Sequence, residues 1–289
     1  MRTDTEIKHL ILEIANQDIR IRAVLLNGSK ANPSVKSDRL QDYDLVFLVD
    51  ELESFTADHS WIHIFGEKII VQLPDNMNFV CENCKKERIG FSYLMLFEDK
   101  NRIDLTLFPV QKFKSDFKPD SLTIIWLDKD LLFPETITPS DADYHIRKPA
   151  YSEFLEICNE FWWVSTYVAK GLLRKEIFYA KEMLETIVRP MFMRMIHWKV
   201  GVENNFGIST GTASKHLKKY LTYELYNKIL LTYSNHEIEE NWKAFFLMTE
   251  LFIETTEFVA GNLGFEVNKE EEQNTSGYLK ELFLEQHNY

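Results

Sequence analysis

Short apolar runs and longer amphipathic stretches divide the chain into two halves. In the first half, runs rich in β-branched and aliphatic residues are typical of buried strands. They cover residues 21–27 (IRAVLLN), 45–49, 65–73, 93–97, 102–108 and 123–127. Before them, apolar residues at positions 7, 10, 11 and 14 share one helical face, and Thr3 or Thr5 can cap that helix. The pattern predicts a mixed β-sheet with helices on one face.

The second half carries helical periodicity. Long patterns cover residues 151–170, 176–199 and 236–260, and Pro190 is expected to kink or interrupt the middle one. A loop with Pro134, Pro139 and Pro149 separates the halves, which puts the domain boundary near residue 148. We therefore predict an α+β protein with a sheet domain at 1–148 and a C-terminal helical bundle domain at 149–265.

Two further features of the helical half concern packing. The stripe of Trp242, Phe245, Phe246, Thr249, Phe252 and Ile253 is more typical of a bundle core than of a ligand site. His197, beside Trp198, is expected to be structural. The acidic tail, 266–289, has weak periodicity apart from Leu279, Leu282 and Phe283, which predicts either a mobile segment or a short helix.

The candidate chemistry lies at the ends of two predicted strands. Gly28 and Ser29 follow the first, and Asp42, Tyr43 and Asp44 lead into the second. Because side chains alternate along a strand, Asp42 and Asp44 face one side and Tyr43 the other. Two adjacent carboxylates repel each other unless a hard cation such as Mg²⁺ lies between them. Glycine allows close approach of a phosphate, and Ser29 can donate to its oxygens.

Asp104 is a third acidic candidate. It lies within an apolar run, where an acid is costly without a partner. If its strand pairs with the one that carries Asp44, the three carboxylates could hold metal or take a proton from an attacking hydroxyl. The alternatives are an edge-strand acid facing water for Asp104 and a solvated turn for the other two.

Composition narrows the function classes. The chain has 289 residues, 45% of them hydrophobic, which allows a sizeable core and two domains. Its net charge of −12 argues against a nucleic-acid polymerase, since a polyanion calls for a basic patch. The acidic surface suits a cationic substrate, although ordinary solubility explains it equally well.

Targeting signals and cysteines point to the cytoplasm. Neither a signal sequence nor a membrane-spanning run is visible, so a cytoplasmic protein without membrane partners is expected. Three cysteines fit a reduced compartment, and Cys81 with Cys84 lacks the second pair that a zinc site needs.

Several longer motifs make the sequence similar to a known family. Gly28, Ser29, Asp42, Asp44 and Asp104 match the polymerase-β-like nucleotidyltransferase superfamily. The chain more closely resembles the aminoglycoside 6-adenylyltransferases, or streptomycin adenylyltransferases, from its start to about residue 260. The matching segments are 20–24 (RIRAV), 27–30 (NGSK), 41–44 (QDYD), 65–68 (FGEK), 101–107 (NRIDLTL), 127–130 (LDKD) and 158–163 (CNEFWW). One departure is Lys30, where this family more often has arginine.

The resemblance implies a nucleotidyltransferase-type sheet and transfer of AMP from ATP to a hydroxyl of an aminoglycoside, specifically the 6-hydroxyl of streptomycin, giving antibiotic resistance. Asp42 and Asp44 would hold two Mg²⁺ ions, and Asp104 would bind the first ion, accept the proton, or do both. Gly28 and Ser29, with Lys30, would bind the phosphates. The expected partners are ATP and the drug, without nucleic acid, and a monomer is favoured over a dimer.

The helix from residue 151 carries the remaining candidates. Glu160, Trp163 and Tyr167 lie near one face and could receive a guanidinium, whereas the competing interpretation is packing of the aromatics and pairing of Glu160 with a lysine. Lys170 and Arg174 are candidates for binding the triphosphate. The competing interpretation is that they belong to a solvated helix end. Two other functions stay open: adenylylation of a protein, and non-catalytic nucleotide binding.

Overall fold

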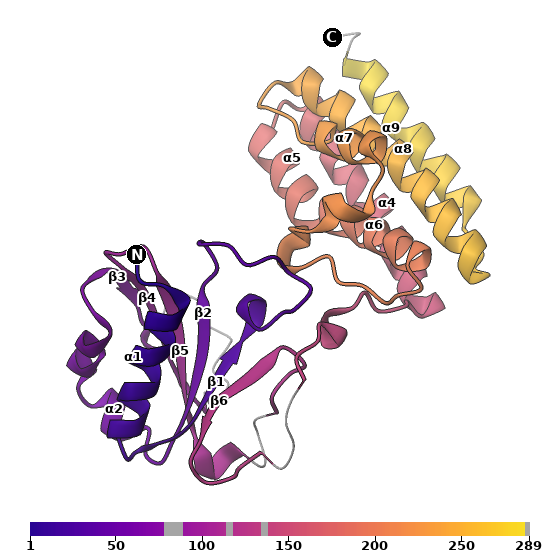
Figure 1. The fold of residues 1–289 in the computed structure, drawn as a ribbon. Coiled ribbons are helices and arrows are strands. Elements are labelled where there is room, and N and C mark those ends of the chain that lie inside the picture. The colour runs from indigo at the N-terminus through magenta and orange to yellow at the C-terminus, as the bar shows by residue number, and fades with distance from the viewer. Residues whose placement is uncertain (78–88, 114–117, 134–137, 287–289) are drawn as a thin grey trace. The chain divides into compact units, whose positions relative to one another are not determined.

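The computed structural model describes residues 1–77, 89–113, 118–133 and 138–286. The chain forms two compact units, Met1–Asp143 and Tyr144–Tyr289 (Figure 1). Within the described residues, unit 1 holds a six-stranded mixed sheet and unit 2 is helical, which confirms the α+β prediction. Cys81 and Cys84 lie outside these residues. Across the described part of the chain, no helix is both long and apolar enough to cross a membrane.

The sheet of unit 1 has the strand order β3-β4-β5-β2-β1-β6. Neighbouring strands are antiparallel, except that β2 and β5 run parallel. The strands are β1 (Ile21–Asn27), β2 (Tyr43–Val49), β3 (Lys68–Gln72), β4 (Phe91–Phe97), β5 (Arg102–Pro109) and β6 (Thr123–Asp128). All six predicted runs therefore contain a strand, and parallel pairing brings β2 and β5, far apart in sequence, to the centre of the sheet.

One strand is shorter than predicted. The run at 65–73 was expected to be a single strand, but the strand begins only at Lys68. The preceding residues form a 3₁₀ helix, His59–Phe65, which ends at Gly66 with φ of 118°. This backbone conformation favours glycine and turns the chain before the strand starts. Local turn chemistry therefore overrides the apolar pattern at this point.

The two faces of the sheet differ in what they pack against. On one face, strand residues such as Leu45, Phe47 and Leu105 form a core with Ile7 and Ile11 of helix α1 (Asp4–Gln17). Figure 1 shows α1 lying along this face. On the opposite face, a smaller cluster is formed by Ala23, Leu25, Val46, Leu48 and Phe108. Helix α1 thus covers one face of the sheet. The opposite face carries the smaller apolar cluster.

Helix α1 begins at a capping box, in which two backbone N–H groups of its first turn are satisfied. Thr3 is the N-cap: its hydroxyl accepts from the Glu6 N–H at 3.3 Å, and the Glu6 carboxylate accepts from the Thr3 N–H at 2.7 Å. Of the two predicted caps, Thr3 is correct. A capping box of this kind fixes where the helix starts.

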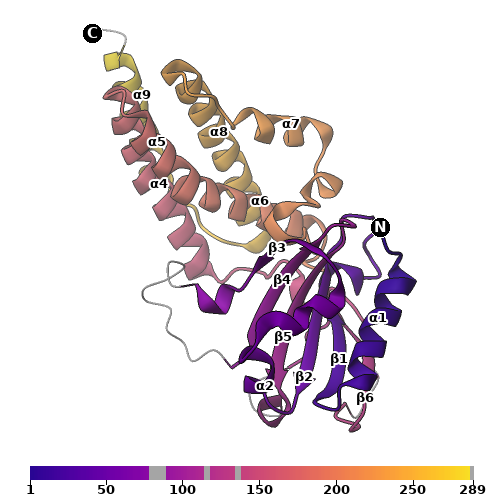
Figure 2. The ribbon, with the colours of Figure 1, turned by 90° about the vertical axis from the view of Figure 1, so that its left-hand side faces the viewer.

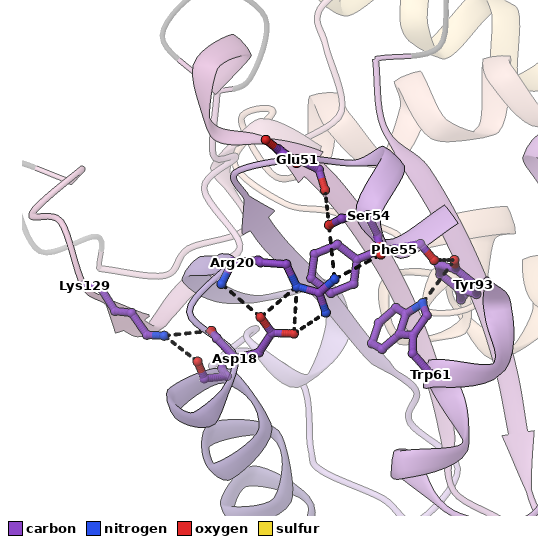
Figure 3. A network of polar contacts seen from close by, with 9 residues as sticks. Asp18, Arg20, Glu51, Ser54, Phe55, Trp61, Tyr93 and Lys129 are labelled. Atoms are coloured by element: carbon purple, nitrogen blue, oxygen red, sulfur yellow. Dashed lines mark hydrogen bonds and ion pairs between the residues drawn. The ribbon is translucent and has the colours of Figure 1, made fainter. Parts of the chain in front are cut away.

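The other end of α1 is held by the polar network in Figure 3. Arg20 donates to the Asp18 carboxylate at 2.6 Å and to the Ser54 carbonyl at 3.0 Å, and its guanidinium lies 4.0 Å from the centre of the Phe55 ring. The Lys129 ammonium, just beyond β6, donates to the carbonyl oxygens of Ala15 and Asp18 at 2.6 and 3.1 Å. The C-terminal end of α1 is therefore tied both to β6 and to the short helix α2 (Glu53–Thr56).

Unit 2 is built from long helices (Figure 2), and aromatic side chains contribute to its core. Trp242, Phe245 and Phe252 of α8 are fully buried, which confirms the predicted core stripe. A π-helical turn, Leu184–Val188, immediately precedes Pro190, so the predicted interruption occurs there. Proline cannot donate the regular helical hydrogen bond, and the bulge accommodates its ring. The helices are α4 (Tyr151–Leu173), α5 (Ile177–Met183), α6 (Arg189–Glu203), α7 (Tyr223–Leu231), α8 (Ile238–Leu263) and α9 (Lys269–Gln286).

The acidic tail forms helix α9, so of the two predicted alternatives the helix is correct, although it is longer than expected. Leu279 and Leu282 are buried in the helical core, and the Phe283 ring packs 5.4 Å from that of Trp242. Asn159 of α4 also donates to Glu271 of α9 at 3.0 Å. A narrow apolar stripe is thus enough to dock a strongly charged helix.

His197 is half-buried in unit 2, where its Nε2 is 2.8 Å from the Ser214 hydroxyl. Burial, together with the nearby Arg194, lowers the pKa of His197. The folded protein then binds this proton less well than the unfolded chain, so stability is fully present above about pH 6.5 and is lost as pH falls through the lowered pKa.

We therefore expect the unfolding temperature to fall between pH 7 and pH 5, and to fall less in the His197→Gln variant, whose side chain is never charged. Thermal unfolding at both pH values measures this difference. His9→Gln, at a side chain that is 80% exposed, is the matched control. An equal fall in wild type and His197→Gln would contradict the prediction.

Candidate active site

Three polar side chains line up across the centre of the sheet, one on each of three neighbouring strands. Asn27 of β1 is the cross-strand partner of Asp44 in β2, and Asp44 is in turn the partner of Asp104 in β5. Partners in register present their side chains to the same face of a sheet. The expectation that the strand of Asp104 lies beside that of Asp44 is therefore confirmed.

This row lies on the face opposite α1. Tyr43, the first residue of β2, is 2% exposed and belongs to the core on the α1 side. Asp44 alternates with it, on the side of Val46 and Leu48. Asp42 precedes the strand and contacts the same arginine as Asp104. The structure thus brings together the carboxylates that the sequence singled out, and points Tyr43 away from them, as predicted.

Arg102 joins two of the carboxylates. Its Nε and Nη2 donate to the two oxygens of Asp104 at 2.8 and 2.7 Å, and its Nη1 lies 3.6 Å from Asp42 Oδ2. These contacts, the pair with Asp104 first, raise the pKa of the arginine. Residues 102 and 104 are two apart on one strand and share a face, and this alternation is the signal by which the sequence could have identified Arg102. A positive charge already lies between the two acids.

Gly28 brings the backbone of the Gly-Ser turn against Asp44. Its φ is +71°, and a Cβ atom added there would lie 2.2 Å from Asp44 Oδ2. Gly28–Lys30 forms one 3₁₀ turn, and the Gln41 side-chain amide donates to the Ser29 carbonyl at 3.2 Å. The turn and the carboxylates are therefore packed as one structure, and no other residue type fits at position 28 without moving the acid.

Lys30 lies on the other side of this turn. Its ammonium donates to Asp4 Oδ1 at 2.8 Å and lies 4.3 Å from the centre of the Tyr43 ring, with the side chain only 10% exposed. These contacts are on the α1 side of the sheet. A phosphate contact by Lys30 stays a prediction, and this geometry does not support it.

The predicted substrate residues lie in sequence along α4. Trp163 is 61% exposed, its Nε1 donates to the Tyr167 hydroxyl at 2.8 Å, and the Lys170 ammonium lies 5.8 Å from the Tyr167 ring centre. Glu160 is exposed one turn earlier, and Arg174 is the exposed C-cap of the helix. Exposed Trp163 and half-buried Tyr167 and Lys170 thus form one contiguous group on the helix, and Tyr167 also packs against the helical core.

The acids of unit 1 can contribute oxygen ligands to a divalent cation. In the described part of the chain, no group of three or more His, Cys, Asp or Glu side chains is placed so that it could hold a metal ion by itself. Mg²⁺ does not require one, since it is usually bound by one or two carboxylates together with substrate phosphates and water. The in-register pair of Asp44 and Asp104, with the Asp44 carboxylate packed against the backbone of Gly28, supplies two carboxylates for that incomplete type of site.

Comparisons with known proteins all identify similarity to one family of enzymes. The profile of the family described as streptomycin adenylyltransferase matches residues 1–282. An aminoglycoside 6-adenylyltransferase of Campylobacter jejuni is 40% identical over 266 residues, 92% of this chain and 91% of that protein. One of Bacillus subtilis (strain 168) is 38% identical over 268 residues, 92% and 93% of the two chains. One of Staphylococcus aureus is 39% identical over 253 residues, 87% and 89%.

A solved structure is also similar. The crystal structure of an aminoglycoside 6-adenyltransferase from Bacillus subtilis has a TM-score of 0.48 and 33% sequence identity, covering 98% of this chain and 99% of that one.

Proposed function

The chain belongs to the streptomycin adenylyltransferase family, and on that premise we propose that it transfers AMP from ATP to a hydroxyl of an aminoglycoside, with streptomycin and its 6-hydroxyl as the acceptor. The observation that carries the proposal is the row of Asp44 and Asp104 in register, with the Gly28 turn packed against it. A phosphate-binding turn beside paired acids is the arrangement that nucleotidyl transfer requires.

Asp42, Asp44 and Asp104 are proposed as the metal-binding and catalytic acids. Bound Mg²⁺, two ions in our proposal, would supply neutralisation of the triphosphate and activation of the attacking hydroxyl. The carboxylates of Asp42, Asp44 and Asp104 would hold the metal ions at the centre of the sheet, where the strands allow little movement. We propose that Asp104, whose side chain is 20% exposed, binds metal, accepts the hydroxyl proton, or does both.

The Gly28 turn is proposed to bind the β- and γ-phosphates of ATP. The φ of +71° at Gly28 gives the turn its shape, and without a Cβ the backbone can approach a phosphate closely. The Ser29 N–H and hydroxyl are the proposed donors to phosphate oxygens. Pyrophosphate would leave from this side after the acceptor hydroxyl attacks the α-phosphorus.

Residues of α4 are proposed to bind the acceptor and the triphosphate. Exposed Trp163, hydrogen-bonded to Tyr167, offers a fixed aromatic surface, and Glu160 offers a carboxylate one turn away. A guanidinium can stack on such a ring and pair with such an acid, and streptomycin carries two guanidinium groups. Lys170 and Arg174 supply positive charge at the C-terminal end of the same helix for the phosphates.

Mass spectrometry of streptomycin after incubation with the protein and MgATP tests the proposal. We expect the drug to gain the mass of one AMP, and Asp42→Asn to give nearly none while keeping the wild-type unfolding temperature. An unmodified drug with wild-type protein that binds ATP would contradict streptomycin as acceptor. Full activity of Asp42→Asn would contradict the metal assignment.

A further inference from the structure

Asp4, in the first turn of α1, contacts Tyr43, which lies between Asp42 and Asp44, and Lys30 of the Gly28 turn, both on the α1 side of the sheet. Its Oδ1 accepts a hydrogen bond from the Tyr43 hydroxyl and one from the Lys30 ammonium at 2.8 Å. Tyr43 lies between Asp42 and Asp44, and Lys30 directly follows Gly28 and Ser29. One carboxylate oxygen therefore connects the strand that carries the acids to the turn that faces them.

The charges at Asp4 reinforce this connection. The hydrogen bonds from Lys30 and then Tyr43 lower the pKa of Asp4, which favours the ionised carboxylate as the acceptor. The Lys30 ammonium also lies over the Tyr43 ring, which favours the same arrangement.

Arg2, two residues earlier, connects the start of α1 to the turn that precedes Asp104. Its backbone N–H and Nε donate to Asp99 Oδ2 at 3.1 and 2.7 Å. The Asn101 side chain donates to the Arg2 carbonyl at 3.1 Å. Burial would raise the pKa of Asp99, but the hydrogen bonds from Arg2 and Asn101 outweigh it and lower that pKa. Asp99 and Asn101 belong to the turn that leads directly into Arg102 and Asp104.

We infer that residues 2–4, the N-terminal brace, position the proposed site, with Asp4 as the positioning residue. The brace contacts Lys30 at the end of the Gly28 turn, Tyr43 between Asp42 and Asp44, and the turn that precedes Asp104, and it touches none of the three proposed catalytic acids. In a pleated strand a shift of Tyr43 reorients the residues on either side of it. This inference rests on the proposed function, because Asp4 can position a catalytic site only if these acids are catalytic.

A pair of aspartates on the same helix provides the test. Asp4→Asn keeps the size of the side chain but removes the charge that holds Lys30, and the Asp4 side chain is 68% exposed, so little stability should be lost. Asp18→Asn makes the same change at the other end of α1, in the network of Figure 3. We expect Asp4→Asn to lower kcat roughly tenfold with the aminoglycoside KM within about twofold of wild type, because misplaced groups lose catalysis. Asp18→Asn should keep the wild-type kcat.

Amide hydrogen exchange gives a readout that is independent of activity. In Asp4→Asn, but not in Asp18→Asn, exchange should become faster at the turn amides of Ala31 and Asn32, which donate to the carbonyls of Gly28 and Ser29. Tyr43→Phe, which keeps the ring and removes the donor, should reproduce both effects.

The outcomes separate the two proposals. An active wild type with unchanged kcat and exchange in Asp4→Asn would overturn the brace and leave the proposed function intact. An equal loss of kcat in Asp18→Asn would also overturn it, because any damage to α1 would then suffice. A wild type that transfers no AMP would overturn the proposed function, and the exchange comparison would still decide whether the brace orders the turn.

Discussion

The Asp44→Asn variant is expected to lose about a thousandfold in kcat, equivalent to about 4 kcal/mol of transition-state stabilisation. The reason is that Asp44 lies between Asn27 and Asp104 in the row across the sheet and directly faces the Gly28 turn. An amide has the same shape but lacks the negative charge that would hold the metal ion against the triphosphate. Steady-state kinetics with MgATP and streptomycin measure the loss.

Asp50→Asn is the matched control for this prediction. Asp50 follows the opposite end of β2, and its half-exposed side chain lies 4.0 Å from Arg22 Nε. The same change of charge on the same strand should leave kcat within about twofold of wild type. Because Asp44→Asn removes one of several neighbouring negative charges, its unfolding temperature should not fall. A marked loss of stability would instead mean that the inactive variant is misfolded and that Asp44 has a structural role.

The Gly28→Ala variant is expected to lose roughly a hundredfold in kcat/KM. The added methyl group would lie 2.2 Å from Asp44 Oδ2, so the carboxylate or the turn must move. The left-handed backbone conformation adds a cost of about 1–2 kcal/mol for a residue with a side chain. Activity and thermal unfolding, measured on the same preparation, separate the displacement of the acid from the loss of stability.

Gly264→Ala reproduces the backbone cost without the collision. Gly264 caps α8 with φ of +72°, and a Cβ atom there would have nothing within 4 Å. We expect this control to be destabilised by a similar amount and to keep full activity at temperatures where it is folded. Should the two variants lose equal activity, backbone strain would explain the effect and the close approach of Gly28 to Asp44 would be irrelevant to catalysis.

Alternation along single strands is the part of the site that could be predicted from the sequence. It placed Asp42 and Asp44 on one face with Tyr43 on the other, and the structure confirms that division. The apolar runs located the strands because burial of β-branched residues is a local property. The start of β3 was missed because the turn at Gly66 depends on backbone conformation and not on hydrophobicity.

Contacts between distant segments could not be predicted in the same way. The sequence predicted that Asp104 joins the other acids only if β5 pairs with β2. It could not predict that pairing, since β3 and β4 lie between these strands in the chain and nothing in either strand specifies its partner. Lys30 was assigned to the phosphates because it follows the Gly-Ser turn, yet its side chain is drawn across the sheet by Asp4, a residue of α1. Arg102 was overlooked because an arginine at a strand end usually faces solvent.

The parallel pairing of β2 and β5 would also make the proposed cation binding a property of the folded chain. Asp44 and Asp104 are held as neighbours only by the sheet, whereas in an unfolded chain they are separated by the whole of β3 and β4. A divalent ion bound by both acids would therefore favour the native state by mass action, by about 2.7 kcal/mol at a hundred times its dissociation constant. The thermal stability of this enzyme would then depend on the concentration of free metal, and a chelator would weaken the centre of the sheet as well as stop the reaction.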